Sequence, residues 1–248
     1  MATAAALFLD LDGTLYRGPE PLRAYALAMA ERAGGGRGQT LAAKAEAFLA
    51  DPRPFVPFRD AWAAISAFGG EAGLDWPRRD EAFLDVRAAI IAGRVPIERT
   101  PGLPAFVRSL DGRVRVAVLT NSDGPSALDL LGYLELGALR AHLRAEANKP
   151  AGFAAAVRDH LRGIGAEKAV SVGDNQVNDI APARALGMAT VHVRWPEAEG
   201  GLADLSVTVL EDAFDALSCH LETALAGRRV EPATDAPAWA QGGNPTCA

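Results

Sequence analysis

Four aspartates in two short segments are the residues of this 248-residue chain whose types and spacing point most clearly to chemistry. Asp10 and Asp12 stand two residues apart at the end of an apolar run, and Gly13 follows them. Asp174 and Asp179 occur in the segment GDNQVND, after another apolar run. A carboxylate in such a place is costly to bury without a cation or hydrogen-bond donors. The two acid pairs therefore predict a site for a hard divalent cation such as Mg²⁺.

A hydroxyl, two turn amides and a lysine complete a set that suits phosphate. Thr120 follows the apolar run that ends at Leu119, and the amides of Asn121 and Ser122 come in the turn after it. Turn amides of this kind favour anions, and Lys149 supplies a positive point charge with three donors. Acids alone would repel phosphate, whereas a metal ion and Lys149 reverse the local field. The combination predicts a site for phosphate together with Mg²⁺.

Four apolar runs predict the strands that bring these residues together. The runs are residues 5–10, 114–119, 169–172 and 189–193. Helical patterns separate the last three runs, at residues 126–132, 150–163 and 179–186. Alternating strands and helices predict a parallel sheet with helices on both faces. Ligands bind at the carboxyl ends of the strands in such a sheet, which is where Asp10, Thr120 and Asp174 would stand.

The long stretch between the first two runs has a different character, because it carries helical patterns and no continuous apolar strand. We expect four or five helices there, including residues 21–32, 41–50, 59–68 and 79–91. Thr40 is a suitable N-cap for the second of these helices. The stretch therefore indicates a helical insert that stands over the edge of the sheet.

The composition argues against several classes of protein. The 25 basic and 31 acidic residues give a formal net charge of −6, whereas a nucleic-acid binder needs a basic face. No apolar run approaches the roughly 20 residues of a membrane span, and the N-terminus lacks the basic start of a secretory signal. Cys219 and Cys247 give no disulfide framework, so we expect a cytoplasmic protein.

Four motifs in this chain resemble, in order, those of the haloacid dehalogenase-like (HAD) hydrolase superfamily. They are FLDLDGTLY, VLTNS, Lys149-Pro150 and VGDNQVND. The resemblance spans residues 7–193 apart from the insert, and it implies an α/β fold with a Rossmann-like three-layer core. The family places a helical cap between its first two motifs. We therefore expect a core of residues 1–15 and 100–226 and a cap of residues 16–99. Residues 227–248 are rich in Pro, Ala and Gly and lack periodicity, which predicts a disordered tail.

The resemblance also implies a role for each motif residue. Asp10 would be the nucleophile that forms an aspartyl-phosphate. Asp12 would protonate the leaving alcohol and then deprotonate the attacking water. The expected phosphate ligands are Thr120, the Asn121 amide and Lys149. The expected metal ligands are the Asp10 carboxylate, the Asp12 backbone carbonyl, Asp174 and, through water or as a support, Asp179.

Asp12 favours phosphate-ester hydrolysis, because expelling an alkoxide needs a proton and expelling a halide does not. A cap would close over the site and exclude polymers, so we expect a Mg²⁺-dependent phosphatase for a small phosphorylated metabolite. Neither nucleic acid nor a membrane is expected as a partner, and the oligomeric state stays open. The alternatives are a phosphonate hydrolase that uses Lys44 as a Schiff base, a sugar-phosphate mutase, and a non-enzymatic phospho-accepting module.

Aromatic and basic residues of the insert have two interpretations, a lid over the substrate or the hydrophobic core of the insert itself. We favour the core for most of them, because small helical layers need aromatic residues. The group comprises Phe55, Phe58, Trp62, Phe68 and Trp76 with Arg53 and Arg59. Arg17 and Arg59 are the two we would test against substrate. We expect His192 to be a packed core residue and Cys219 a buried or helix-face thiol.

Overall fold

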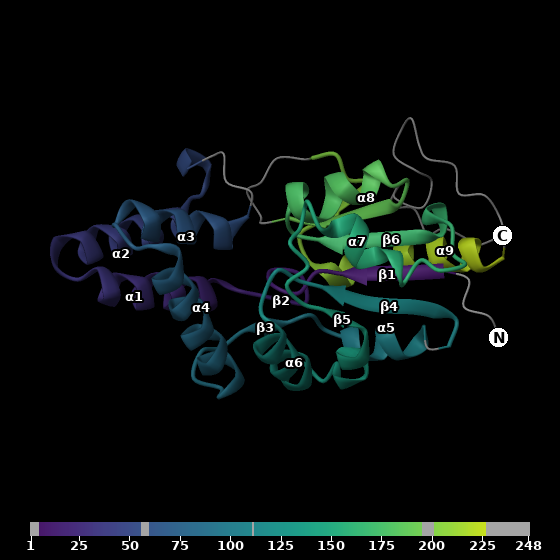
Figure 1. The fold of residues 1–248 in the computed structure, drawn as a ribbon, viewed down its shortest axis with the longest axis horizontal. Coiled ribbons are helices and arrows are strands. Elements are labelled where there is room, and N and C mark those ends of the chain that lie inside the picture. The colour runs from purple at the N-terminus through teal and green to yellow at the C-terminus, as the bar shows by residue number, and fades with distance from the viewer. Residues whose placement is uncertain (1–4, 56–59, 111, 195–200, 227–248) are drawn as a thin grey trace. The chain divides into compact units, whose positions relative to one another are not determined.

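The structure is a computed structural model that describes residues 5–55, 60–110, 112–194 and 201–226. The chain divides into two compact units, whose chain order can be followed in Figure 1. Among the described residues, the core unit runs up to Leu15 and from Thr100 to Arg194, and includes residues 201–226. The insert unit is Tyr16–Arg99. The tail that we expect to be disordered lies outside the described residues.

The core unit is built on a six-stranded sheet with the strand order β5-β4-β1-β6-β7-β8. Each neighbouring pair in it is parallel. The strands are β1 (Ala5–Leu9), β4 (Val114–Leu119), β5 (Leu143–Arg144), β6 (Ala169–Gly173), β7 (Ala189–Val193) and β8 (Leu205–Val207). The four strands expected from apolar runs are confirmed. β5 falls in residues 141–148, which carry only a weak strand pattern, and β8 was not expected; both are too short to carry a periodic signal.

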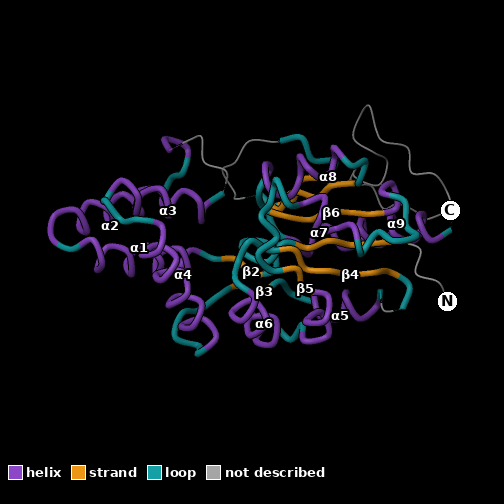
Figure 2. Tube along the Cα trace, in the orientation of Figure 1, coloured by secondary structure: helices purple, strands orange, loops and turns teal. Residues whose placement is uncertain are grey.

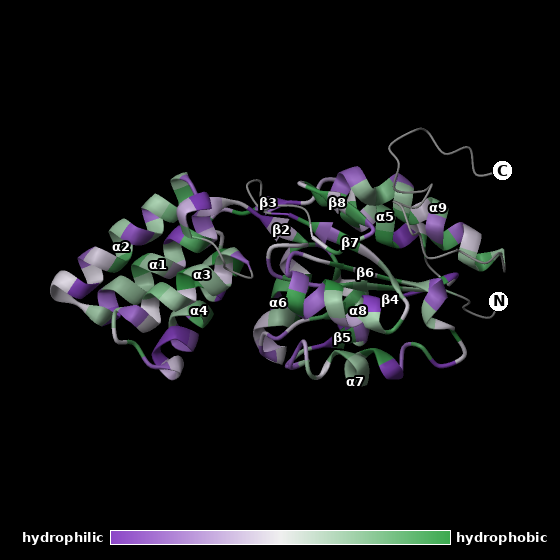
Figure 3. Cartoon of the chain, turned by 90° about the horizontal axis from the view of Figure 1, so that it is seen from above, coloured by the Kyte–Doolittle hydropathy of each residue, from purple (hydrophilic) through white to green (hydrophobic). Residues whose placement is uncertain are grey.

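Helices cover both faces of this sheet, as Figure 3 shows, which confirms the three-layer α/β fold. On one face, Ala6 and Phe8 of β1 join a buried cluster with Phe153 and Ala183, from the helices α7 and α8. On the other face α5 and α9 lie together, and their Phe106 and Phe214 rings stack with centroids 4.4 Å apart. The helices of the core unit are α5 (Leu103–Ser109), α6 (Gly124–Tyr133), α7 (Phe153–Arg158), α8 (Ala181–Ala185) and α9 (Phe214–Leu225).

Short helical turns complete the core unit and shorten two of the expected helices. They are η2 (Gly137–His142), η3 (Ala166–Lys168), η4 (Gln176–Ile180) and η5 (Leu210–Ala213). The helix expected at 150–163 is α-helical only in α7, and turns flank it on both sides. The helix expected at 179–186 is preceded by η4, because the Asn175 side chain accepts from the backbone N–H groups of Val177 and Asn178 and so caps an earlier start.

The insert unit holds the four expected helices and one pair of short strands (Figure 2). The elements described in it are β2 (Tyr16–Arg17), α1 (Pro19–Ala33), α2 (Gly35–Ala50), η1 (Arg53–Phe55), α3 (Ala61–Glu71), α4 (Trp76–Ile91) and β3 (Glu98–Arg99). The strands β2 and β3 pair antiparallel, and Arg17 forms an ion pair with Glu98 across them at 3.2 Å. Arg17 therefore already has a local partner within the insert unit.

The prediction that Thr40 caps the second helix is wrong. Thr40 lies inside α2, and its hydroxyl donates to the carbonyl of Gly36 at 2.9 Å. The glycines before it form a tight turn rather than a loop, since Gly34 and Gly35 both have positive φ angles, 63° and 50°. The helix therefore begins at Gly35, in the run of glycines that follows α1.

Aromatic rings of the insert unit pack against one another in two groups. Tyr25, Trp62 and Phe83 have centroids 5.3–6.0 Å apart. Phe48, Phe55 and Phe68 form the second group, with centroids 5.7–5.9 Å apart. These contacts agree with the interpretation of Phe55, Trp62 and Phe68 as core.

The remaining residues of the aromatic and basic group differ in their surroundings. Trp76 is exposed, and Arg53 forms an ion pair with Asp51 at 2.8 Å. Phe58 and Arg59 lie outside the described residues. Cys219 is half-buried on α9. Within the part of the chain that the structure describes, no helix is both long and apolar enough to cross a membrane.

Candidate active site

Three of the predicted site residues lie where neighbouring strands end. Asp10 follows β1, Thr120 follows β4 and Asp174 follows β6. The sheet order places β1 between β4 and β6, and the strands are parallel, so their carboxyl ends share one edge. The topology therefore brings residues that are more than 160 positions apart in sequence to the same place.

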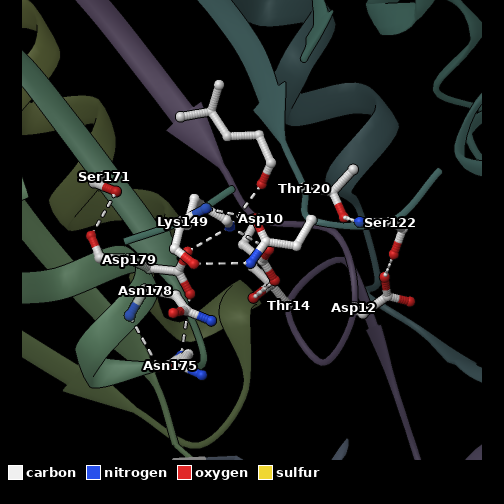
Figure 4. Close-up of polar contacts among 12 residues, drawn as sticks. Asp10, Asp12, Thr14, Thr120, Ser122, Lys149, Ser171, Asn175, Asn178 and Asp179 are labelled. Carbon is white, nitrogen blue, oxygen red and sulfur yellow. Dashed lines mark hydrogen bonds and ion pairs between the residues drawn. The ribbon is translucent and has the colours of Figure 1, made fainter. Parts of the chain in front are cut away.

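The ammonium group of Lys149 is the centre of a buried polar network (Figure 4). Its Nζ donates to Asp10 Oδ1 at 2.7 Å, to Asp179 Oδ1 at 2.6 Å and to the Leu119 carbonyl oxygen at 2.8 Å. The side chains of Lys149, Asp10 and Asp179 are 2%, 11% and 3% exposed. All three ammonium hydrogens are thus engaged, and the lysine links two of the predicted acids.

Burial and charge act in opposite directions on these groups. Burial by itself would lower the pKa of Lys149, but the carboxylates of Asp10 and Asp179 outweigh it and raise the pKa, so the amine stays charged. Burial raises the pKa of the Asp10 carboxyl to about 7, although Lys149 opposes the change and Asp179 adds to it. The nucleophile candidate therefore needs further positive charge to stay ionised at neutral pH.

The acids of the site fit a divalent cation. Asp10, Asp174 and Asp179 each offer one carboxylate oxygen, and these oxygens lie within 4.8 Å of one another. Three carboxylates and the Lys149 ammonium carry a formal charge of −3 + 1 = −2, which a divalent cation would balance. Carboxylate oxygens are also the ligands that Mg²⁺ prefers. The donor set and its charge therefore suit Mg²⁺.

Close packing fixes Asp174 beside the turn after β1. Gly13 has a φ of 84°, a conformation that side chains rarely adopt, and a Cβ there would lie 2.1 Å from Asp174 Oδ2. Asp179 is held on the other side, because its Oδ2 accepts from the Asn175 N–H at 3.2 Å and its carbonyl accepts from Ser171 Oγ at 3.0 Å. Both acids of the second cluster are thus restrained by local backbone.

The carboxylate of Asp12 has different surroundings from that of Asp10. Ser122 Oγ donates to Asp12 Oδ2 at 2.8 Å, and Figure 4 shows this pair on the side of the site away from Asp179. The Thr120 hydroxyl accepts from the Ser122 N–H at 3.0 Å, so it keeps its own hydrogen available for another acceptor. The turn after β4 therefore presents one hydroxyl to Asp12 and orients a second.

A sequence model of one family, described as haloacid dehalogenase-like hydrolase, matches residues 4–187. The chain belongs to the haloacid dehalogenase-like hydrolases. The resemblance carried by the four motifs is thereby confirmed, and the protein is a hydrolase of this family. The comparison with curated proteins gives no significant match.

Solved structures show the same fold as this HAD-like hydrolase. A haloacid dehalogenase-like protein from Agrobacterium tumefaciens has a TM-score of 0.59 and 15% identity, over 87% of this chain and 98% of that one. A HAD-like family hydrolase from Xanthomonas campestris has a TM-score of 0.55 and 15% identity, over 91% and 95%. The HAD hydrolase YfnB from Bacillus subtilis, in a structure with bound magnesium, has a TM-score of 0.55 and 14% identity, over 86% and 98%.

The HAD-like hydrolase also uses side chains that sequence reasoning missed. Ser122 was considered only for its amide, and its hydroxyl bonds Asp12. Asn121 was expected to act through its backbone, yet its side chain pairs with the backbone of Lys149. Its Nδ2 donates to the Lys149 carbonyl at 3.0 Å and its Oδ1 accepts from the Lys149 N–H at 2.7 Å. The sequence does show a polar residue beside each of these motif residues, but it does not reveal which group the polar side chain contacts.

Proposed function

We propose that this HAD-like hydrolase is a Mg²⁺-dependent phosphatase that hydrolyses a small phosphorylated metabolite through a phosphorylated Asp10. The observation that carries the proposal is that two carboxylates only two residues apart have different partners. Asp10 is bound to Lys149 in the candidate metal cluster, whereas Asp12 is bound to the Ser122 hydroxyl. A nucleophile near a cation and a separate acid for the leaving group are what phosphate-ester hydrolysis requires.

In the first step the Asp10 carboxylate would attack phosphorus in line with the ester oxygen. The bond from phosphorus to that oxygen breaks, and Asp12 donates its proton to the departing alkoxide. Asp12, now a carboxylate, then takes a proton from a water molecule that attacks the acyl phosphate. Inorganic phosphate leaves and Asp10 is regenerated.

The other residues of the site would hold the phosphoryl oxygens and balance charge. The Thr120 hydroxyl, which accepts from Ser122, can donate to one of these oxygens, and the Asn121 N–H can donate to another. Lys149 would offset the negative charge around Asp10 throughout the reaction. When bound by Asp10, the Asp12 carbonyl, Asp174 and Asp179, Mg²⁺ supplies positive charge that stabilises the phosphoryl oxygens in the transition state. The magnesium in the Bacillus subtilis structure supports this choice of metal.

The proposal makes the loss of the nucleophile its first test. Asp10→Asn should abolish hydrolysis of p-nitrophenyl phosphate in the presence of Mg²⁺, because the amide cannot form the acyl phosphate. The circular dichroism spectrum should stay that of the wild type. Asp129→Asn, an exposed acid on α6, is the matched control and should keep full activity. Retained turnover in Asp10→Asn would refute the role of Asp10.

The alternatives receive no comparable support from local contacts. Lys44 forms an ion pair with Glu71, and its ammonium lies 4.4 Å from the centre of the Phe68 ring. The Lys44 side chain is therefore engaged by an acid and an aromatic ring of the insert unit, and these contacts do not favour Schiff-base formation. Assays of phosphonates and sugar bisphosphates beside a panel of phosphorylated metabolites would separate the remaining activities. We also propose a cytoplasmic location, as expected from the two cysteines.

A further inference from the structure

His192 lies on β7, next to the strand that ends at the second acid cluster. The register of the two strands pairs His192 with Gly173, the residue before Asp174. The histidine is 3% exposed, and its Nε2 lies 3.0 Å from the Asp174 carbonyl oxygen. His192 therefore contacts the backbone of a residue whose carboxylate belongs to the candidate metal cluster.

A chain of hydrogen bonds determines which nitrogen of the His192 ring carries the proton. The Leu202 N–H donates to Gln176 Oε1 at 3.3 Å, which turns the Gln176 amide nitrogen toward the ring. Gln176 Nε2 then lies 2.8 Å from His192 Nδ1 and donates to it. A neutral imidazole has one donor and one acceptor, so an accepting Nδ1 leaves the proton on Nε2. The ring therefore donates to the Asp174 carbonyl.

Asp174 is restrained from two directions as a result. The Nε2–H of His192 holds its backbone carbonyl, and the backbone of Gly13 limits the space around its carboxylate, as the 2.1 Å approach of a Cβ to Asp174 Oδ2 indicates. A movement of the Asp174 backbone would shift its carboxylate relative to those of Asp10 and Asp179, with which it forms a cluster of oxygens within 4.8 Å of one another. The hydrogen bond from His192 acts against such a movement.

We propose that His192 is a positioning residue for the metal site, which aims the Asp174 carboxylate by fixing the Asp174 carbonyl. Gln176 supports it by holding the ring in the tautomer that donates. The inference rests on the proposed function, because it requires a divalent cation at Asp10, Asp174 and Asp179. A histidine that merely fills space in the core would allow an aromatic replacement without any change in metal affinity.

The test measures binding of Mg²⁺ alone to the metal-free full chain by isothermal titration calorimetry. His192→Phe keeps a ring but loses the donor, and should raise the Kd for Mg²⁺ by roughly 10-fold or more, the usual effect of losing a hydrogen bond that supports a metal ligand. His192→Gln places an amide N–H close to the position of Nε2, and should recover most of the affinity. Circular dichroism and thermal unfolding establish that each variant is folded.

A matched control separates the metal effect from the loss of a buried histidine. His160 is also buried in the core unit, where its ring packs against Phe8 with centroids 6.1 Å apart. His160→Phe should leave the Kd for Mg²⁺ unchanged, whatever it does to the unfolding temperature. Equal Mg²⁺ affinities for the wild type and His192→Phe would overturn the role of His192. A wild type that does not bind Mg²⁺ would instead overturn the metal site and the proposed function with it.

Two further measurements test the proposal even if His192→Phe does not fold. Nitrogen chemical shifts of the histidine rings should show His192 protonated on Nε2 and unprotonated on Nδ1, and the reverse assignment would overturn the proposal. Gln176→Leu removes the donor to Nδ1 and frees the ring to place its proton there. This variant should weaken Mg²⁺ binding less than His192→Phe does, and an unchanged Kd would count against the hydrogen-bond chain.

Discussion

The two lysines Lys149 and Lys44 show how differently the core and insert units use the same residue type. The side chain of Lys149 is 2% exposed and has three oxygen acceptors. The side chain of Lys44 is 33% exposed, forms an ion pair with Glu71 and lies over the Phe68 ring. A buried charge requires partners on every side, whereas a half-exposed one is satisfied by water and a single acid. The core unit therefore buries an ion-pair network at the sheet edge, and the ion pairs of the insert unit lie among partly exposed side chains.

The largest effect should come from removing the ammonium of the core unit. Lys149→Met leaves Asp10 and Asp179 buried without their shared partner, which should destabilise the chain by about 3–5 kcal/mol in urea unfolding and abolish the proposed phosphatase activity. Lys44→Met is the matched variant, and it should change the stability by only about 0–1 kcal/mol and leave activity intact. Equal losses in the two variants would remove the distinction between the two units.

The pH dependence of stability should also come from the core unit, because all four histidines lie there. Burial lowers the pKa of His220 from 6.5 to about 4, so the unfolded chain binds a proton more readily than the folded one. The contribution of His220 to stability should therefore fall by roughly 3 kcal/mol as the pH decreases from about 6.5 to about 4, while the raised pKa of Asp10 acts in the opposite direction. His220→Phe should reduce that fall in urea unfolding. An unchanged pH profile would assign the loss to other groups.

Two glycines with positive φ angles allow a comparison of backbone strain with and without a neighbouring functional group. Gly13 faces Asp174, whereas a Cβ at Gly93, with a φ of 71° at the end of α4, meets nothing within 4 Å. Gly93→Ala should cost about 1–2 kcal/mol of stability from strain alone. Gly13→Ala should carry the same strain and in addition weaken Mg²⁺ binding in calorimetry. Unchanged Mg²⁺ affinity in Gly13→Ala would mean that Asp174 can adjust without loss.

The smallest expected effect concerns the serine that holds Asp12. Ser122→Ala should reduce kcat by about 10-fold for alkyl phosphates, since a hydrogen bond to a charged group contributes about 1.5–3 kcal/mol. The loss should be smaller for p-nitrophenyl phosphate, whose leaving group needs less help from an acid. Ser66→Ala, in the insert unit, is the control. The same loss for both kinds of substrate would show that Ser122 does not act through Asp12.

The sequence was sufficient for those parts of the fold that leave a regular pattern. The four strands in the interior of the sheet have helices on both faces, so their apolar runs are continuous. They are β1, β4, β6 and β7. The prediction for Thr40 was wrong because a helix-capping residue and a residue one turn inside a helix look alike in sequence when glycines precede both. The contacts between side chains could not be predicted from the sequence either. The hydrogen bond from Ser122 to Asp12, for example, depends on β4 lying beside β1 and on the direction of the turn after each strand.

The junction between the two units has a consequence for the engineering of this hydrolase. Thr100 donates to the Leu15 carbonyl through both its backbone N–H, at 3.4 Å, and its hydroxyl, at 3.1 Å. The chain thus leaves and re-enters the core unit at two residues that are already bonded to each other. Residues 16–99 are therefore an insertion whose two ends are held together by these hydrogen bonds. The insertion can be exchanged or lengthened at an entropic cost of loop closure that grows only slowly with its length.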